Sequence, residues 1–405
     1  MSFEQGLSGL NAASRNLDVI GNNVANASTV GFKSADAIFA DVYANSLSSS
    51  ASTSAGIGVS VASVQQQFVQ GTISTTSNPL DVAINGNGFF RMDTAGAITY
   101  SRNGQFHLDK DGYIVNVAGS KLSGYAVDAA GNIVASAPLP LQVSSGQLQA
   151  NMTTTAGIGL NLDSSKTAAV GAFDPADSKT YNNSTSMAVF DSLGNSHTLG
   201  TYYAKTGANT WAVYGTFDGA ALPASLGTLT FKTDGTLDTT ATTLPFNVSQ
   251  ALTNGATSPF AFTLDYAKAT QFGSSFSVDS LSQDGYTAGL LSGYSIADDG
   301  ILQGQYSNGQ TRTLGQVSLA RFTNLNGLEP IGNNQWRESS QSGQAIIGAP
   351  GSSNFGVVQS GAVEESNVDL TNELVAMITA QRVYQANAQT IKTQDQMLNT
   401  LVNLR

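Results

Sequence analysis

The closing stretch of the sequence, residues 370–405, reads LTNELVAMITAQRVYQANAQTIKTQDQMLNTLVNLR and decides how the rest of the chain is interpreted. Apolar side chains recur in it every seven positions, at Leu370, Met377, Tyr384, Ile391 and Leu398. Neither proline nor glycine interrupts residues 362–405, so this pattern predicts one continuous helix. About 35–39 helical residues would extend roughly 52–58 Å, which is too long to lie on a compact domain.

A second apolar seam of the same predicted helix is weaker. Leu374 occupies it together with Ala388 and Val402, but Gln381 and Asp395 interrupt it. A strong two-stranded zipper requires apolar residues at both seam positions. We therefore expect this helix to need partners on more than one side.

The beginning of the chain predicts a second and less regular helix. Its apolar residues follow a spacing of three and four: Phe3, Leu7, Leu10, Leu17 and Val24. Ser14 and Gly21 weaken this stripe. A helix of about 24 residues with such a seam is marginal alone. We therefore predict that the seams of both helices bury against other copies of the chain, although a helical hairpin packed on its own domain is the simpler alternative.

Between the two helices the sequence predicts β-structure. Short alternating runs are separated by turn pairs such as Asn103-Gly104, Asp218-Gly219 and Asp284-Gly285. These pairs supply the positive φ angles of tight hairpins, and many hairpins favour antiparallel sheets. The predicted fold class is mixed: an α-helical, coiled-coil-like core from both termini plus two nested, mainly antiparallel β domains.

The composition of successive segments predicts a nested domain order. Residues 44–56 form a linker rich in Ser and Ala, and the text around 135–158 suggests entry into a second β domain. The predicted parts are an N-terminal core helix (1–25), a connecting linker segment (26–70), the first part of an inner β domain (71–145), an outer inserted β domain (146–284), the second part of the inner domain (285–358), and a connecting segment with the C-terminal core helix (359–405).

Composition excludes several kinds of chemistry. The 405 residues include no cysteine and two histidines, which leaves no thiolate or multi-histidine metal site. Asp109-x-Asp111-Gly112 lacks the remaining ligands of a calcium loop and is typical of a turn. A net charge of −11 without a basic run disfavours nucleic acid as a partner. We expect no catalytic residues, no cofactor, no metal and no membrane insertion.

Several blocks then resemble a known family. Asn22-Asn23-Val24-Ala25-Asn26, followed by Thr29-Val30-Gly31-Phe32-Lys33, resembles the signature of bacterial flagellar rod and hook proteins. Residues 80–90, 100–106 and 361–370 support the resemblance, and residues 384–405 are similar to the hook members in particular. The residues of this chain that match the family signature are Asn22, Asn23, Asn26, Thr29, Gly31, Phe32 and Lys33.

The resemblance implies a structural protein and not an enzyme. Members of the hook branch form a helical, tubular homo-oligomer that is curved and hollow, and that passes motor torque to the filament as a universal joint. The implied partners are the distal rod protein, the hook cap, the hook–filament junction proteins and the flagellar type III export apparatus, and the implied location is the extracellular flagellum. Residues MSFEQGLSGL do not read as a secretory signal, which agrees with that export route.

Two other interpretations stay open at the level of sequence. A distal rod subunit would be rigid rather than flexible, and a secreted β-rich adhesin would be a monomer with dispensable termini. The absence of cysteine separates the chain from spirochaete hook proteins, whose subunits are crosslinked through a cysteine.

Overall fold

The computed structural model describes residues 2–42, 58–128, 131–144 and 146–403. The chain divides into two compact units, one of residues 1–144, 293–305 and 311–405 and the other of residues 145–292 and 306–310. The predicted linker at 44–56 lies outside the described residues. The six-part division of the sequence stays a prediction, and each unit is described here by itself.

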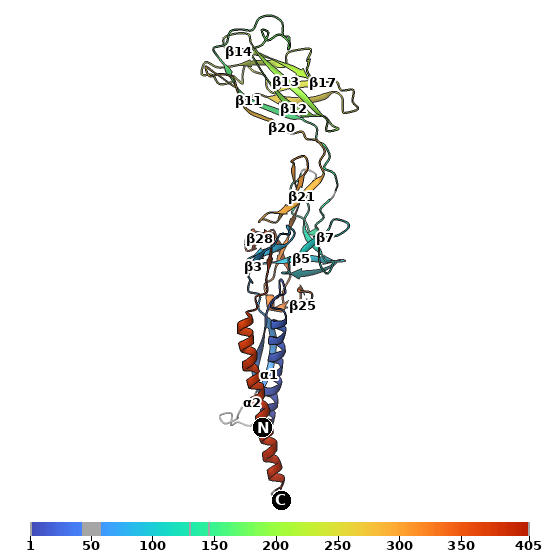
Figure 1. The fold of residues 1–405 in the computed structure, drawn as a ribbon, viewed down its shortest axis with the longest axis vertical. Helices are drawn as coiled ribbons and strands as arrows, with labels where there is room; N and C mark the ends of the chain where they lie inside the picture. The colour runs from blue at the N-terminus through green and yellow to red at the C-terminus, as the bar shows by residue number, and fades with distance from the viewer. Residues whose placement is uncertain (1, 43–57, 129–130, 145, 404–405) are drawn as a thin grey trace. The chain divides into compact units, whose positions relative to one another are not determined.

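A helix at each end of the chain confirms that part of the predicted fold. Helix α1 (Ser2–Ala25) and helix α2 (Leu370–Asn403) run side by side in opposite directions (Figure 1). Asp369 caps α2, because its Oδ1 accepts hydrogen bonds from the backbone N–H groups of Thr371 at 2.9 Å and Asn372 at 3.2 Å. No helix within the described ranges is both long and apolar enough to cross a membrane.

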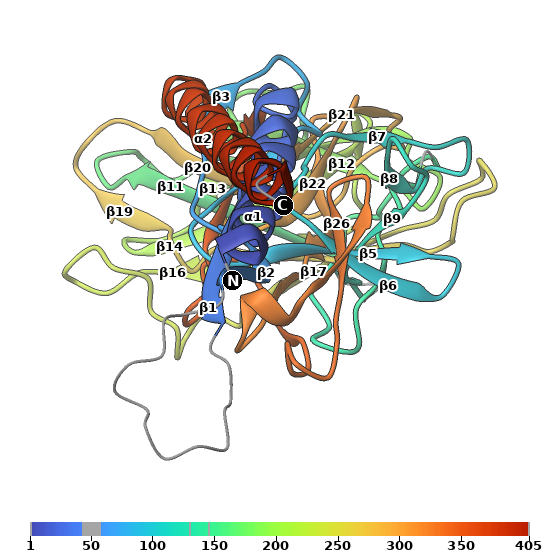
Figure 2. The same cartoon turned by 90° about the horizontal axis from the view of Figure 1, so that it is seen from below.

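A β-hairpin packs on the first helix. Strands β1 (Ala35–Val42) and β2 (Gly58–Gln66) pair antiparallel, with Ala35 opposite Gln66. Figure 2 looks along the helices and shows α1 between α2 and this hairpin, in agreement with the contacts that α1 makes to both. The helical end of the first unit is therefore built from three elements, with α1 in the middle.

The rest of the first unit is mainly antiparallel β-structure. Its elements are β3 (Ile73–Thr75), β4 (Val82–Asn85), β5 (Phe89–Thr94), β6 (Ala97–Ser101), β7 (Phe106–Leu108), β8 (Ile114–Asn116), β9 (Lys121–Tyr125), β10 (Leu139–Pro140), β21 (Leu291–Ile296), β22 (Ile301–Tyr306), β23 (Thr311–Val317), β24 (Leu319–Arg321), the short 3₁₀ helix η1 (Leu325–Gly327), β25 (Glu329–Gly332), β26 (Gln335–Arg337), β27 (Ile346–Gly348), β28 (Val357–Ser360) and β29 (Ala362–Glu364). Strands β3 and β4 pair antiparallel with β29 and β28, which joins early and late parts of the chain.

An aromatic cluster lies inside this part of the first unit. Phe89 and Trp336 pack edge to face with ring centroids 5.7 Å apart, and Tyr100 packs on Phe322 at 4.7 Å. Trp336 is 2% exposed and its Nε1 donates a hydrogen bond of 2.6 Å to Gln66 Oε1 on β2. The core of the β part is thereby bonded directly to the hairpin.

The second unit contains two five-stranded sheets around one core. Its strands are β11 (Thr155–Asp163), β12 (Asn183–Phe190), β13 (Ser196–Lys205), β14 (Thr210–Phe217), β15 (Ala220–Ala221), β16 (Gly227–Thr230), β17 (Phe246–Gln250), β18 (Phe260–Asp265), β19 (Thr270–Phe272) and β20 (Ser277–Gln283). Buried side chains of both sheets, including Leu160 from one and Trp211 from the other, belong to one hydrophobic cluster. This is the packing of a β-sandwich.

One strand of this sandwich differs from the hairpin pattern expected from the sequence. Strand β11 pairs in parallel with β18 and β19, and antiparallel with β20. Parallel pairing requires a long crossover connection, and the chain between Asp163 and Phe260, which contains the other sheet, supplies it. Turn signals report hairpins only, so the sequence pattern could not reveal this crossover.

Candidate assembly surface

Small residues let the two terminal helices approach closely. A Cβ atom placed on Gly6 would lie 3.1 Å from Ile391 Cγ1, and one on Gly9 would lie 2.9 Å from Asn387 Oδ1. Ala13 and Ala380 are buried in the same seam. Small residues at these positions of α1 therefore lie where α2 approaches closely.

The predicted self-assembly residues lie around this seam, and half of them face solvent. Leu7 is 44% exposed, Leu370 47%, Leu374 44%, Tyr384 38% and Leu398 59%. The other five are partly buried: Leu10, Leu17, Val24, Met377 and Ile391. Large exposed apolar side chains on adjacent helices are uncommon in a monomer and mark a surface that a partner covers.

Apolar side chains flank the seam on both helices, and some of them are exposed. On α2, Leu370 and Leu374 are four residues apart and point within about 40° of each other at about 100° per residue. We call the surface made by Leu7, Leu10, Leu17, Val24, Leu370, Leu374, Met377 and Tyr384 the apolar ridge. Ile391 is not part of it because its side chain packs on Gly6.

The final turns of α2 have no α1 beside them. Gly6 lies opposite Ile391 and Asn23 opposite Glu373, so the antiparallel pairing ends near residue 394. Met397 and Leu398 follow that point and are 62% and 59% exposed. This overhang is a second apolar surface without a cover inside the described chain.

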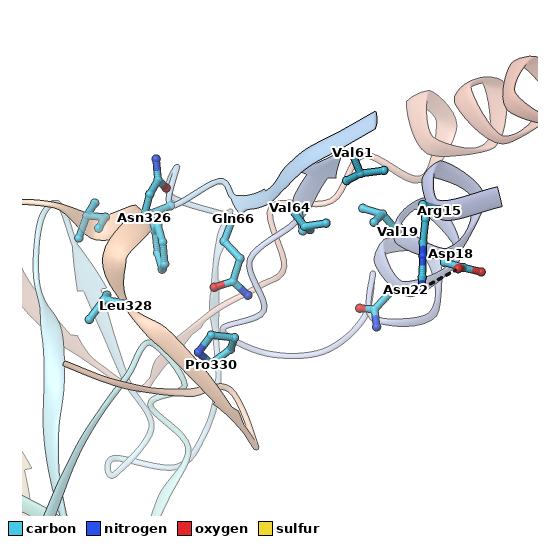
Figure 3. Close-up of a pocket in the computed structure, with 13 residues that line it drawn as sticks. Arg15, Asp18, Val19, Asn22, Val61, Val64, Gln66, Asn326, Leu328 and Pro330 are labelled. Carbon is cyan, nitrogen blue, oxygen red and sulfur yellow. Dashed lines mark ion pairs between the residues drawn. The ribbon is translucent and has the colours of Figure 1, made fainter. Parts of the chain in front are cut away.

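A third exposed apolar surface lines a cleft of about 590 Å³ beside the hairpin (Figure 3). It is lined by Val19 of α1, Val61 and Val64 of β2, and Pro330 of β25, with the buried Leu328 beside them. An exposed ion pair, Arg15 with Asp18 at 3.7 Å, lies at its rim. The cleft thus combines apolar walls with a charged edge, as protein interfaces commonly do.

The signature segment, which begins in the last turn of α1, is held in place by hydrogen bonds. Asn23 is 1% exposed; its Nδ2 donates to Ala35 O at 2.9 Å and to Glu373 Oε1 at 2.9 Å, and its Oδ1 accepts from Ala35 N. Asn26 accepts a bond from Thr29 Oγ1 and donates to Asn22 O. Asn23 therefore joins α1, the start of β1 and the first turn of α2.

Gly31 is constrained by both its backbone and its surroundings. Its φ of +71° lies in the left-handed region, which L side chains rarely adopt. A Cβ atom there would lie 2.5 Å from Asn103 N. Its N–H donates a 2.8 Å bond to Glu364 O. Phe32 is partly buried beside it.

Lys33 ends the signature in a buried ionic triad. Its Nζ lies 2.6 Å from Glu364 Oε1, and Arg102 Nη1 lies 3.1 Å from Glu364 Oε2. The Lys33 and Glu364 side chains are fully buried. Gly71 N also donates to Glu364 Oε1 at 2.9 Å, and Lys33 Nζ donates to Val69 O at 2.8 Å. The triad therefore joins the end of the signature, the β part and the segment before α2.

The electrostatics of the triad make Glu364 its central member. Burial lowers the pKa of Lys33, and the attraction of Glu364 opposes that shift. Burial also lowers the pKa of Arg102, whose guanidinium lies 5.3 Å from the centre of the Phe89 ring. One carboxylate balances two cations, so removing it leaves buried charges without compensation.

Sequence reasoning singled out Lys33 but not its partners. Glu364 and Arg102 lie in blocks that the resemblance includes, 361–370 and 100–106, and this was the available signal. The pairing could not be inferred because 331 positions separate Lys33 from Glu364. Asn367 is a candidate cap of the last helix from the sequence, but Asp369 caps it. Asn367 instead bonds to the segments around β1 and β2: its Oδ1 accepts from Ser34 N at 2.8 Å and its Nδ2 donates to Gln67 O at 2.7 Å.

The second unit holds one cluster of titratable groups. His197 Nδ1 lies 2.7 Å from Asp218 Oδ2, and His197 Nε2 lies 3.4 Å from Asp191 Oδ2. Burial opposes protonation, but the hydrogen bonds to both carboxylates outweigh it and raise the pKa of His197. Across the described ranges, His, Asp and Glu side chains nowhere gather in threes suited to a metal ion.

Comparison with known proteins shows which family the chain belongs to. Four family models match parts of the chain: Flagella basal body rod protein (residues 3–33), Flagellar hook protein FlgE/F/G D1 domain (83–163), Flagellar basal body protein FlaE D2 domain (161–286) and Flagellar basal body rod FlgEFG protein C-terminal (359–404). The flagellar hook protein FlgE of Escherichia coli (strain K12) is 45% identical over 412 residues, which cover 100% of both chains. The chain belongs to the flagellar hook protein family.

Other relatives agree with this placement. The flagellar hook protein FlgE of Salmonella typhimurium is 45% identical over 419 residues and 100% of both chains. That of Rhizobium meliloti is 35% identical and covers 100% of this chain and 98% of its own. A crystal structure of Helicobacter pylori flagellar hook protein FlgE2 shares the fold, with a TM-score of 0.54 at 14% identity over 71% of this chain and 99% of that one.

Membership of the hook family gives the chain its role. It is a structural subunit of the flagellar hook, a part of the basal body, and its family is not an enzyme family. The family also implies a helical polymer of subunits. The resemblance to flagellar rod and hook proteins, which the sequence predicts from the signature and the closing residues, is thereby confirmed.

Proposed function

We propose that this hook subunit polymerises through its two terminal helices, which form a coiled-coil-like core of a hollow, curved tube. The observation that carries the proposal is the apolar ridge, of which Leu7, Leu370, Leu374 and Tyr384 stay exposed in the single chain. Burying a large apolar side chain fully contributes on the order of 1.5–3 kcal/mol. Burying several such side chains per copy would therefore favour assembly over the single chain, in which they are exposed to water.

The buried triad then gives the polymer a mechanical connection. Lys33, Arg102 and Glu364 attach the end of α1 and the start of α2 to the β part through bonds of 2.6–3.1 Å. Force applied to the helices is therefore transferred to the β-sheets through short, water-excluded bonds. This connection suits a universal joint that transmits torque from the rod to the filament.

The second unit has a different proposed role. The interval 122–311 that contains it has five Lys, no Arg and 13 Asp, so its surface is mildly acidic and rich in Ser, Thr, Asn and Gly. Such a surface makes weak, hydrated contacts that exchange as the tube turns. Deleting residues 146–284 should accordingly change curvature more than it changes retention of subunits in the polymer. Loss of all assembly on that deletion would contradict this division of roles.

The resemblance extends the proposal to export and to neighbours. The subunit would leave the cell by the flagellar type III route and act in the extracellular hook. It would meet the distal rod protein at one end of the hook, the hook cap during growth, and the hook–filament junction proteins at the other end. Neither nucleic acid nor a membrane is a proposed partner.

Electron microscopy of the purified chain after polymerisation tests the proposal. Curved hollow tubes are expected from the parent chain, and soluble protein from a Leu374→Asp variant because a charge cannot be buried in an apolar contact. Leu193→Asp, at an exposed leucine of the second unit, is the matched control and should still polymerise. Straight tubes would refute the curved joint, and seeded parent protein that stays monomeric would refute polymerisation through the helices.

A further inference from the structure

A groove lies between α1, α2 and the β1–β2 hairpin, and its wall on α2 faces away from Leu374 of the apolar ridge. It measures about 470 Å³, and small residues of α1, namely Gly9, Ala12 and Ala13, form its floor. Thr379 and Val383 of α2 form one wall, and Phe39 and Val59 of the hairpin form the other. None of its eleven lining residues carries a charge, so its chemistry fits an apolar side chain.

Helix geometry places Leu374 of the ridge opposite one wall of the groove. Leu374 belongs to the ridge and Val383 lines the groove, and the two are nine residues apart on one helix. Nine residues correspond to about 2.5 turns, so their side chains point in opposite directions. Both are exposed, Leu374 by 44% and Val383 by 49%. Each copy therefore presents large apolar side chains on one face and a small-residue channel on the other.

Two different, complementary faces on one molecule have a known consequence. A contact between unlike patches is heterologous, and it generates an open helical polymer when the rotation between copies does not close a ring. Large side chains seated between small ones are also the arrangement that makes helices pack as knobs into holes. A groove that faced its own kind would give a closed dimer instead, which is not the assembly that the hook family forms.

We propose that the groove is the receptor for the apolar ridge of a neighbouring copy, with Leu370 and Leu374 seated over Gly9, Ala12 and Ala13. This inference rests on the proposed polymerisation through the terminal helices and names the partner surface within it. The occupant is a second copy of this chain, because the ridge supplies exposed apolar side chains that match the uncharged, small-residue groove and the hook family forms a helical polymer of identical subunits.

Cysteine crosslinking tests the pairing, and a chain without native cysteine gives a clean background. Two variants, Leu374→Cys and Val383→Cys, are polymerised separately and as an equal mixture, and then oxidised. The mixture should give a disulfide-linked dimer and neither variant alone should. The double variant should give a ladder of multimers, because its two cysteines are about 13 Å apart along one helix and cannot bridge within a chain.

The control is Val375→Cys, which replaces a neighbouring side chain that is 60% exposed but points about 100° away from Leu374. Its mixture with Val383→Cys should give no dimer. Tubes that form normally and yield no Leu374–Val383 dimer, or yield as much dimer with Val375→Cys, would overturn the pairing while leaving the proposed function intact. Parent protein that forms no tubes would overturn the proposed function itself.

A second experiment tests the groove without the cysteine variants, in case those variants assemble poorly. Thr379→Trp fills the groove without entering the seam between the helices, since Thr379 is exposed. It should abolish tube formation while the circular dichroism of the chain is unchanged, and the near-isosteric Thr379→Val should still form tubes. Normal tubes from Thr379→Trp would contradict occupation of the groove.

Discussion

Replacing Leu374 with alanine should raise the critical concentration for polymerisation. The side chain is 44% exposed in the single chain, and that fraction is what assembly can still bury. With about 1.5–3 kcal/mol for full burial of a leucine, the remaining 44% corresponds to about 0.7–1.3 kcal/mol per subunit. Since each 1.4 kcal/mol changes an equilibrium constant tenfold, we expect a roughly 3- to 9-fold increase.

Sedimentation of polymer at a series of total protein concentrations measures this quantity directly. Leu374 is a better position than Ile391, because Ile391 packs on Gly6 and its substitution would disturb the single chain as well. Leu193→Ala is the control: the same substitution at a leucine that is 57% exposed in the second unit, with no expected change. An unchanged critical concentration for Leu374→Ala would refute the assignment of Leu374 to a buried contact between copies.

Three further changes test the interior of the subunit. Glu364→Gln leaves two buried cations without their carboxylate and should lower the free energy of unfolding by about 3–5 kcal/mol in urea titration, whereas the exposed neighbour Glu365→Gln should change it little. Gly31→Ala introduces a Cβ 2.5 Å from a backbone nitrogen at a φ of +71° and should lower the melting temperature; an unaltered melting temperature would mean that the loop relaxes freely. The raised pKa of His197 contributes stability that is fully present below its unfolded pKa of about 6.5 and is lost as the pH rises through the folded pKa. The second unit, followed by the fluorescence of buried Trp211 in a Trp336→Phe background, should therefore unfold more easily on the alkaline side of that window, and His197→Gln should remove the pH dependence.

Much of the fold could be predicted from the sequence because its signals are local. The seven-residue repeat that begins at Leu370 and the turn pairs of the β part each act within a few positions of the chain, and the structure shows a helix at each end of a mainly β chain. The seam of α2 was harder to assign. The sequence predicts one seam at Leu370, Met377, Tyr384, Ile391 and Leu398 and a weaker one at Leu374, Ala388 and Val402. In the structure Ile391 packs on Gly6, whereas Asn387 packs on Gly9 in a close approach that a hydrophobic pattern does not report.

The buried contacts could not be predicted for a different reason. Asn23 and Lys33 were recognised as signature residues, but their partners Glu373 and Glu364 lie more than three hundred positions away. A charged residue on its own indicates a solvated surface, and only the folded chain shows that these charges are enclosed. The groove could not be predicted from the sequence either, since Gly9, Ala12 and Ala13 lie between the apolar positions of the predicted helix and nothing in the pattern marks them as the floor of a channel.

The pairing of the two chain ends has a consequence for the timing of folding. Contacts between residues far apart in sequence form slowly, because the intervening chain loses conformational entropy when the loop closes, before the contact energy is gained. The bond between Lys33 and Glu364 closes a loop of 331 positions, and the α1–α2 seam closes a longer one. A chain whose last segment has not yet emerged can fold its second unit but can complete neither the triad nor the helix pair. The order of synthesis therefore keeps an unfinished subunit from presenting a complete surface for polymerisation.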